Sequence, residues 1–144
     1  MSENPATSDP RLAAQPPIVV SDTDYARLTT LARDAEKRFP RAAHDLLAEM
    51  ERAQIVPPGA LPQRVVRMGS RVVFRADDGR TRNVELVFPG RADIGAGRVS
   101  VLTPIGAALI GLAEGQSITW QTREGQTRRL TIVSVKSEAE ETVD

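Results

Sequence analysis

Few side chains in this chain of 144 residues could do chemistry on a substrate. The only histidine is His44, and there is no cysteine, which excludes a thiolate nucleophile and a sulfur-ligated zinc site. Ser70, Ser100, Ser117 and Ser134 fall in predicted strands and turns and have no second histidine to act as a general base. Gly95 and Gly97 are not followed by the Lys-Ser or Lys-Thr pair of a phosphate-binding loop. We therefore predict a protein that is not an enzyme and holds no cofactor.

The carboxylates that come nearest to a metal-site arrangement flank one predicted turn. Asp34 and Glu36 precede this turn and Asp45 follows it, whereas Mg²⁺ needs carboxylates or phosphates that converge on one point. Three basic side chains crowd the same turn, Lys37, Arg38 and Arg41. We interpret the acidic residues as solvated helix charges, and His44 as a surface residue. No metal is predicted at the tip residues Asp34, Glu36, Arg38 and Arg41.

Two amphipathic helices position that turn. Ser21 to Asp24 form an N-cap cluster, after which apolar residues recur every three or four positions to about Arg38. Phe39 ends this helix, because a residue before proline is pushed away from the helical region. A second stripe of the same period runs from Ala43 to Ala53. The pattern predicts a short antiparallel coiled coil, about 20 to 25 Å long at 1.5 Å per residue.

Composition divides the chain into five predicted segments. These are a disordered leader (1–17), the helical hairpin (18–56), a proline-rich linker (57–63), a strand-rich domain (64–136) and a disordered acidic tail (137–144). The leader has neither the basic start nor the apolar core of a secretory signal, and no apolar run is long enough to cross a bilayer. We expect a soluble, cytoplasmic protein that has no membrane partner. Lys and Arg balance Asp and Glu at 19 each, which argues against nonspecific coating of DNA.

The strand-rich domain is predicted to hold about five strands and one short helix. The strand candidates are 64–76, interrupted at Gly69 and Ser70, then 82–88, 98–102, 117–122 and 128–135. Asp77 to Arg80 contains Asp-Gly, a strong hairpin signal. Thr103 can cap a helix that starts at Pro104, where a missing N–H has no cost. The fold class is α+β, and its expected core residues are Val66, Val72, Phe74, Val84, Leu86, Val99, Val101, Ile105, Leu109, Ile118, Trp120, Leu130 and Ile132.

The segment from Ala92 to Leu112 carries a family resemblance. Its sequence ADI followed by GRVSVLTPIGAALIG resembles the carboxy-terminal domain of the Gre transcript-cleavage factors, and MGSRVVF (68–74) resembles the first strand of that domain. The closer match, from about Pro17 to Val135, is to nucleoside diphosphate kinase regulators, which are Gre-related bacterial proteins with a shortened helical hairpin. The resemblance implies a half-wrapped, FKBP-like antiparallel sheet.

The resemblance also implies a partner. In Gre factors the corresponding loop and turn contact the coiled-coil rim of the RNA polymerase secondary channel, which the β′ subunit forms. Carried over to this sequence, the contact residues are Asp93, Ile94, Thr103, Pro104 and Ile105. The Gre hairpin tip holds a catalytic magnesium ion with two acidic residues, and this tip does not reproduce them. The expectation is a monomeric, non-cleaving transcription regulator that meets DNA or RNA only through the transcription complex and is an implied regulator of nucleoside diphosphate kinase.

Two alternatives remain open. From Arg64 to Arg98 the sequence has eight arginines against four acidic residues, which permits a polymerase-independent adaptor that binds a protein or a nucleic acid through a basic face. An FKBP-like sheet also makes peptidyl-prolyl isomerase activity a candidate function. That activity needs an apolar pocket lined by aromatic side chains. The chain has five aromatic residues, and we interpret Trp120 as a core residue rather than a pocket floor.

Overall fold

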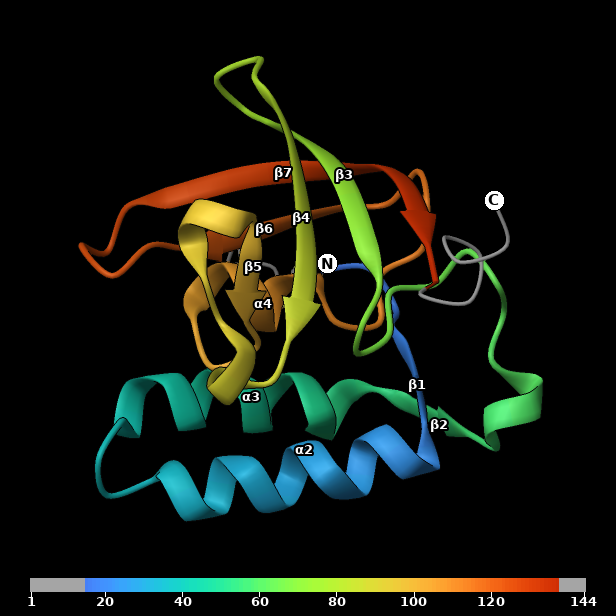
Figure 1. The fold of residues 1–144 in the computed structure, drawn as a ribbon, viewed down its shortest axis with the longest axis vertical. Coiled ribbons are helices and arrows are strands. Elements are labelled where there is room, and N and C mark those ends of the chain that lie inside the picture. The colour runs from blue at the N-terminus through green and yellow to red at the C-terminus, as the bar shows by residue number, and fades with distance from the viewer. Residues whose placement is uncertain (1–14, 138–144) are drawn as a thin grey trace, which may run out of the picture.

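The computed structural model describes residues 15–137, so most of the predicted leader and nearly all of the acidic tail lie outside the described residues. The structure confirms the α+β class: two helices come first, and a mixed sheet with one short helix follows (Figure 1). None of the helices in the described range is long and apolar enough to cross a membrane.

The first two helices form the predicted antiparallel hairpin. Helix α2 (Asp22–Ala35) starts at Ser21, whose hydroxyl accepts a hydrogen bond from the Asp24 N–H at 3.1 Å. Helix α3 (Pro40–Arg52) begins with proline at its first position, where no intrahelical N–H is needed. Helix α2 ends at Ala35 rather than near Arg38. The connecting turn is therefore slightly longer than the periodicity suggested.

A two-stranded parallel ladder closes the base of the hairpin. Strand β1 (Val19–Ser21) pairs with β2 (Gln54–Val56), so that the chain entering α2 is hydrogen-bonded to the chain leaving α3. This ladder has no signal in the sequence, because strands of three residues are too short to show alternation. A 3-10 turn, η2 (Pro58–Ala60), then begins the linker to the main sheet.

The main sheet has five strands in the order β5-β4-β3-β7-β6. Their bounds are β3 (Arg71–Ala76), β4 (Thr81–Val87), β5 (Arg98–Ser100), β6 (Ser117–Gln121) and β7 (Thr127–Lys136). All neighbouring pairs are antiparallel except β4 and β5, which are parallel, so the sheet is mixed rather than fully antiparallel. Because β5 follows β4 through a loop with two 3-10 turns, η3 (Pro89–Arg91) and η4 (Ile94–Ala96), the chain has room to return in the same direction.

Two strand predictions were wrong in extent. Residues 64–68 are not a strand: Val65 makes one isolated bridge with Ala113, and the Val66 N–H donates to the Leu112 carbonyl at 2.8 Å. This segment therefore pairs with the chain that leaves the short helix and does not extend β3. The strand predicted over 98–102 stops at Ser100, where the chain turns toward that helix.

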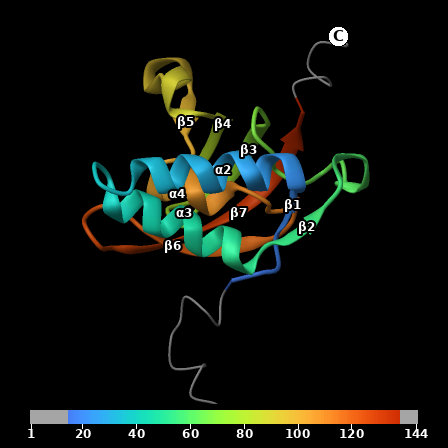
Figure 2. The ribbon, with the colours of Figure 1, turned by 90° about the horizontal axis from the view of Figure 1, so that it is seen from below.

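Helix α4 (Pro104–Leu109) lies between the hairpin and the sheet, packed against α3 on one side and near β6 on the other (Figure 2). Gly106 makes this position possible. A Cβ at Gly106 would stand 2.0 Å from the carbonyl oxygen of Ser100, so only glycine lets the helix approach the end of β5 so closely.

One apolar core joins the hairpin to the sheet. Leu28, Leu46 and Met50 of the hairpin belong to the same buried cluster as Leu109 of α4 and residues of the main sheet. Most of the predicted core is confirmed, since nine of its members are buried: Val66, Val72, Phe74, Leu86, Val101, Leu109, Ile118, Leu130 and Ile132. Val84, Val99, Ile105 and Trp120 are only partly buried.

Polar contacts also fix the hairpin against the sheet domain. The buried Asp24 carboxylate accepts from the backbone N–H of Met68 at 3.2 Å, and the guanidinium of Arg27 lies 4.5 Å from the centre of the Phe88 ring. The Arg52 side chain donates to the carbonyl of Pro16. The contacts of Asp24 and Arg27 join α2 to the sheet domain, whereas the Arg52 bond joins α3 to the chain that enters β1.

Candidate functional site

The loop between β4 and β5 presents Asp93 and Ile94 to solvent. Oδ1 of Asp93 accepts from the N–H of Ala96 at 3.3 Å, and Oδ2 lies 3.8 Å from Nη1 of Arg98. The Asp93 side chain nevertheless stays 57% exposed, and Ile94 is 88% exposed. Asp93 thus caps a turn and keeps a carboxylate available to a partner.

The turn that follows β5 is held by three partly buried hydrogen bonds of side-chain hydroxyls. The hydroxyl of Thr103 donates to the Ser100 carbonyl at 2.6 Å and accepts from the Gly106 N–H at 3.1 Å. The buried Ser100 hydroxyl accepts from the Leu102 N–H at 2.9 Å. The Thr103 hydroxyl is therefore occupied by capping, as predicted. The side chains of Leu102 and Pro104 remain as the partly exposed apolar surface of this turn.

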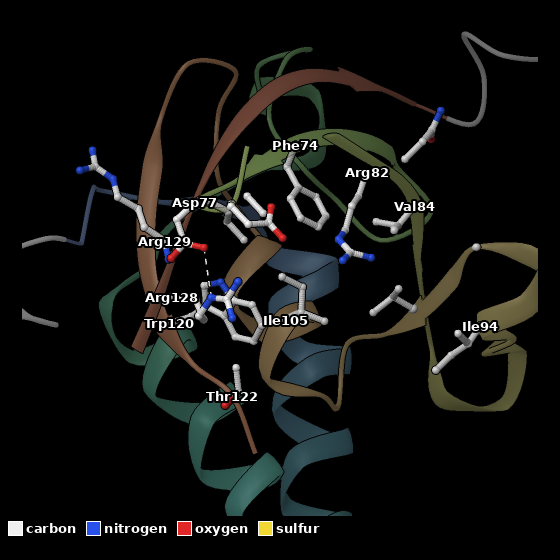
Figure 3. Close-up of a pocket in the computed structure, with 16 residues that line it drawn as sticks. Phe74, Asp77, Arg82, Val84, Ile94, Ile105, Trp120, Thr122, Arg128 and Arg129 are labelled. Carbon is white, nitrogen blue, oxygen red and sulfur yellow. Dashed lines mark hydrogen bonds and ion pairs between the residues drawn. The ribbon is translucent and has the colours of Figure 1, made fainter. Parts of the chain in front are cut away.

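The structure does not gather the five predicted docking residues into one cluster. Ile94 and Ile105 line the same open pocket on the concave face of the sheet (Figure 3). Pro104 instead faces the helical hairpin, where it lines two other grooves. Asp93 is directed toward Arg98 and lines none of these three cavities.

The hairpin tip carries both acidic and basic side chains. Asp34 and Glu36 are exposed, and Arg41 forms an ion pair with Asp45 at 3.9 Å on the following turn. Within residues 15–137, no three His, Cys, Asp or Glu side chains come together as possible metal ligands. The guanidinium of Arg38 stands 5.5 Å from the centre of the Phe39 ring, which is 52% exposed. His44 is exposed on α3.

A groove of about 550 Å³ joins this tip to the turn after β5. Phe39, Pro40 and Arg41 line one side of it, and Leu102 and Pro104 line the other. Sequence reasoning did not connect the tip with this turn. The two segments are more than sixty positions apart in the chain, and only the packing of α3 against α4 brings them together.

The concave face of the sheet is open beyond the end of α4. A pocket of about 580 Å³ there is lined by residues from all five strands and from α4 (Figure 3). Its apolar walls come from Phe74, Val84, Val99, Ile105, Trp120 and Leu130. Trp120 was interpreted as a core residue; it packs against the core and also lines this pocket, so that interpretation was incomplete.

The surroundings of two carboxylates shift their pKa values in opposite directions. Asp77, at the mouth of the pocket, accepts from the Arg129 backbone N–H and from Nε of Arg128, both at 3.1 Å; the backbone hydrogen bond above all lowers the pKa of Asp77. On α3, burial raises the pKa of Glu49 despite its 2.9 Å contact with Arg52.

The arginines between Arg64 and Arg98 do not form one free basic face. Arg64, Arg71 and Arg98 each form an ion pair with a glutamate, and Arg67 donates to the Pro62 carbonyl at 2.8 Å. The remaining four are exposed and have no ion pair among the described residues: Arg75, Arg80, Arg82 and Arg91. Three of the eight arginines therefore pair with a carboxylate within the protein, and two of them, Arg71 and Arg98, share Glu85.

Comparison with known proteins matches both parts of the chain. Residues 61–137 match the family model for transcription elongation factor GreA/GreB, C-terminal part, and residues 16–56 match the model for the Rnk N-terminus. The regulator of nucleoside diphosphate kinase from Escherichia coli (strain K12) is 35% identical over 88% of this chain and 94% of its own length. Transcription elongation factor GreA from Thermodesulfovibrio yellowstonii is 32% identical over 61% of this chain and 56% of its own length.

A solved structure agrees with these matches. The prokaryotic transcription elongation factor GreA/GreB from Nitrosomonas europaea is 36% identical, superposes with a TM-score of 0.66, and is matched over 83% of this chain and 98% of its own. The chain therefore belongs to the GreA/GreB family of transcription elongation factors. Within it, the amino-terminal match makes the chain similar to relatives of the Rnk type, which confirms the resemblance read from the sequence.

Proposed function

We propose that the protein is a transcription regulator that binds RNA polymerase near the rim of the secondary channel and does not stimulate transcript cleavage. The observation that carries this proposal is family membership along both parts of the chain, together with a presented loop and turn at the positions expected to dock. Polymerase is the partner that the names of the GreA/GreB relatives support, since those proteins are transcription elongation factors.

The proposed contact uses two kinds of residue. Asp93 supplies a 57% exposed carboxylate that can pair with an arginine of the rim, and Ile94 supplies an exposed apolar side chain beside it. Thr103 orders the turn that presents Pro104 and Ile105, because its hydroxyl is used within the protein. A turn that is already ordered loses little conformational entropy when it docks.

We propose that the protein does not stimulate transcript cleavage because of the residues at its hairpin tip. Lys37, Arg38 and Arg41 surround the turn, and Asp34 and Glu36 are exposed without converging on a common point in the described structure. The hairpin also packs along α4, so its tip lies beside the turn after β5. A tip held there would shield the rim and exclude longer factors, rather than reach into the channel.

Regulation of nucleoside diphosphate kinase belongs to the same proposal. The relative from Escherichia coli carries that function in its name, and this chain has no phosphate-binding loop of its own. A regulator that acts on polymerase could change the amount of that kinase without contacting it.

Competition on polymerase tests the main proposal. Purified core RNA polymerase carrying a fluorescently labelled Gre factor is titrated with the full chain, and we expect the label to be displaced. The double variant Asp93→Ala/Pro104→Ala should lose displacement by about tenfold or more. The matched control Asp78→Ala/Pro62→Ala removes one exposed carboxylate and one exposed proline away from the proposed docking residues and the hairpin tip, and should compete like the wild type. Equal competition by both variants would contradict docking through this surface.

A polymerase-independent adaptor is the second candidate, supported by exposed arginines that have no ion pair in the described structure, among them Arg80, Arg82 and Arg91. An interaction carried by these residues should weaken steeply as salt rises and should be lost on replacing them with glutamine. The same triple variant should still displace a Gre factor from polymerase if the main proposal is correct.

A further inference from the structure

Strand β6 carries backbone groups that the fold does not use. It is an edge strand of the main sheet and pairs only with β7. Where the ladder continues beyond β6, the Thr122 N–H donates to the Gln126 carbonyl at 2.9 Å. Because bonded positions alternate along an antiparallel ladder, the N–H and C=O groups of Thr119 and Gln121 point away from β7. Within residues 15–137 these groups have no hydrogen-bond partner.

A groove of about 390 Å³ lies along this free edge, and we call it the edge groove. Helix α3 forms its opposite wall, and Figure 2 shows β6 running beside α3. The helix side of the groove presents the exposed residues His44, Ala48 and Glu51. The floor consists of the buried residues Ala107, Ala108 and Ile118. An edge strand that faces a groove is the arrangement in which an extended peptide can add to a sheet.

The charged side chains of the edge groove leave one carboxylate free. Arg41 pairs with Asp45 at 3.9 Å, and Arg52 pairs with Glu49 at 2.9 Å. Glu51 is exposed and has no ion pair in the part of the chain that the structure describes. The groove therefore favours a partner with a basic side chain. Its small and apolar floor favours an apolar side chain next to that basic one.

We propose that the edge groove binds an extended segment of a partner protein, which adds to β6 as a further strand. The segment bonds to the backbone of Thr119 and Gln121, places an apolar side chain on the floor of the groove, and carries a Lys or Arg that pairs with Glu51. In this mode of recognition the main-chain hydrogen bonds provide affinity and the alternate side chains provide specificity.

The chain's own backbone borders one end of the edge groove. Gln15 lines the groove, and the side-chain amide of Gln116 donates to the Pro17 carbonyl at 3.3 Å. The free part of the edge is therefore the end of β6 that contains Thr119 and Gln121. The proposal goes beyond polymerase docking, because the hydrogen-bonding groups that it uses lie on neither the loop nor the turn that we propose to dock.

Hydrogen exchange on the full chain first tests whether the edge is free. The amides of Thr119 and Gln121 should exchange at least about tenfold faster than those of Ile118 and Trp120, which face β7. Equal protection of the four amides would overturn the proposal. The edge would then already be covered, by residues 1–14 or by a second copy of the chain.

Peptide titration tests the added strand. The ¹⁵N-labelled full chain is titrated with the capped peptide KVAVK, with EVAVE, and with two singly N-methylated forms of KVAVK, one methylated at the alanine and one at the valine before it. We expect KVAVK to shift the Thr119 and Gln121 amide signals with a Kd on the order of 500 µM. EVAVE should bind at least about threefold more weakly, because it reverses the charge.

The two N-methylated peptides separate strand addition from other modes of binding. Alternate residues of an added strand direct their N–H toward β6, so one methylated peptide should lose binding and the other should keep it. Absence of any shift with KVAVK, or equal affinities of the two methylated peptides, would overturn the proposal.

Three variants assign the site, each with its fold checked from the ¹H–¹⁵N spectrum. Thr119→Pro removes an outward N–H, which an edge strand tolerates, and should abolish the binding of KVAVK, whereas Thr119→Val should bind like the wild type. Ala48→Arg fills the groove from an exposed helix position and should weaken KVAVK at least about tenfold, whereas Ala48→Ser should not. Glu51→Gln should weaken KVAVK about threefold and leave the neutral peptide QVAVQ unchanged. Unchanged affinity of KVAVK for Ala48→Arg would refute the assignment even if Thr119→Pro does not fold.

Discussion

The loop around Asp93 and the turn around Thr103 were predicted together as one docking surface, yet the fold treats them differently. The turn is anchored by three hydrogen bonds among Ser100, Leu102, Thr103 and Gly106, and its Ser100 is buried. The loop is closed by backbone hydrogen bonds between Asp93 and Arg98, but its side chains add only one exposed cap and an exposed ion pair, and Ile94 projects into solvent. A substitution in the turn should therefore act mainly on stability, and one in the loop mainly on binding.

The largest expected effect comes from Gly106→Ala. The new Cβ would lie 2.0 Å from the Ser100 carbonyl oxygen, and this contact is with backbone, which cannot move aside cheaply. We expect a loss of about 3 kcal/mol or more, or failure to fold. Urea unfolding of Gly106→Ala and of the loop variant Gly95→Ala measures the difference, because a Cβ at Gly95 meets only an Asp93 carboxylate oxygen at 3.6 Å. Similar midpoints for the two variants would break the comparison.

Thr103→Val should have the next largest effect. It removes a hydroxyl that both donates to Ser100 and accepts from Gly106, and it keeps the shape of the side chain. The expected loss of unfolding free energy is about 1 to 2 kcal/mol. Thr103→Ser keeps the hydroxyl and should lose clearly less in the same urea titration. Equal losses would show that the methyl group stabilises the turn as much as the hydroxyl does.

Asp93→Ala should lower stability by only about 0.5 kcal/mol, because the cap and the ion pair that it removes are exposed. Competition with a Gre factor on polymerase should fall in the same variant. Measuring both quantities on one preparation sharpens the contrast with Thr103→Val. A large loss of stability would show that Asp93, like Thr103, acts mainly as a structural residue.

The smallest effect concerns pH. Burial raises the pKa of Glu49 above its ordinary 4.5, so the folded state binds this proton more tightly than the unfolded state. The associated stability is present below the unfolded value and is lost as pH rises through the higher folded pKa. Glu49→Gln should reduce the dependence of the unfolding free energy on pH when urea midpoints are compared from about pH 4 to about pH 7.

Asp77 should show the opposite trend, because the hydrogen bond from the Arg129 N–H lowers its pKa. Its stabilising effect is present above the unfolded pKa and is lost as pH falls through the lower folded pKa. Asp77→Asn is the matched variant for the acidic side of the same curve. A pH dependence unchanged in both variants would contradict these assignments.

Local chemistry made several features predictable from sequence. Ser21 and Thr103 cap helices, Pro40 and Pro104 start them, and the Asp-Gly of residues 78 and 79 lies in the turn between β3 and β4, as expected. Each of these depends on residues within four positions of one another, so the sequence window contains all the partners. The family resemblance was visible for the same reason, in the run from Ala92 to Leu112.

Long-range pairing determined the rest. Residues 64–68 have the alternation of a strand but bond to the chain after α4, and the short strands β1 and β2 pair in parallel with no local signal. Nothing in the sequence around Trp120 indicates whether it is a core residue or lines a pocket. The sequence by itself determined the helix starts, the tight turn between β3 and β4, and the family. Only the tertiary structure decided that α4 stops short of covering the sheet and that the hairpin tip lies beside Pro104, because both depend on where distant segments pack.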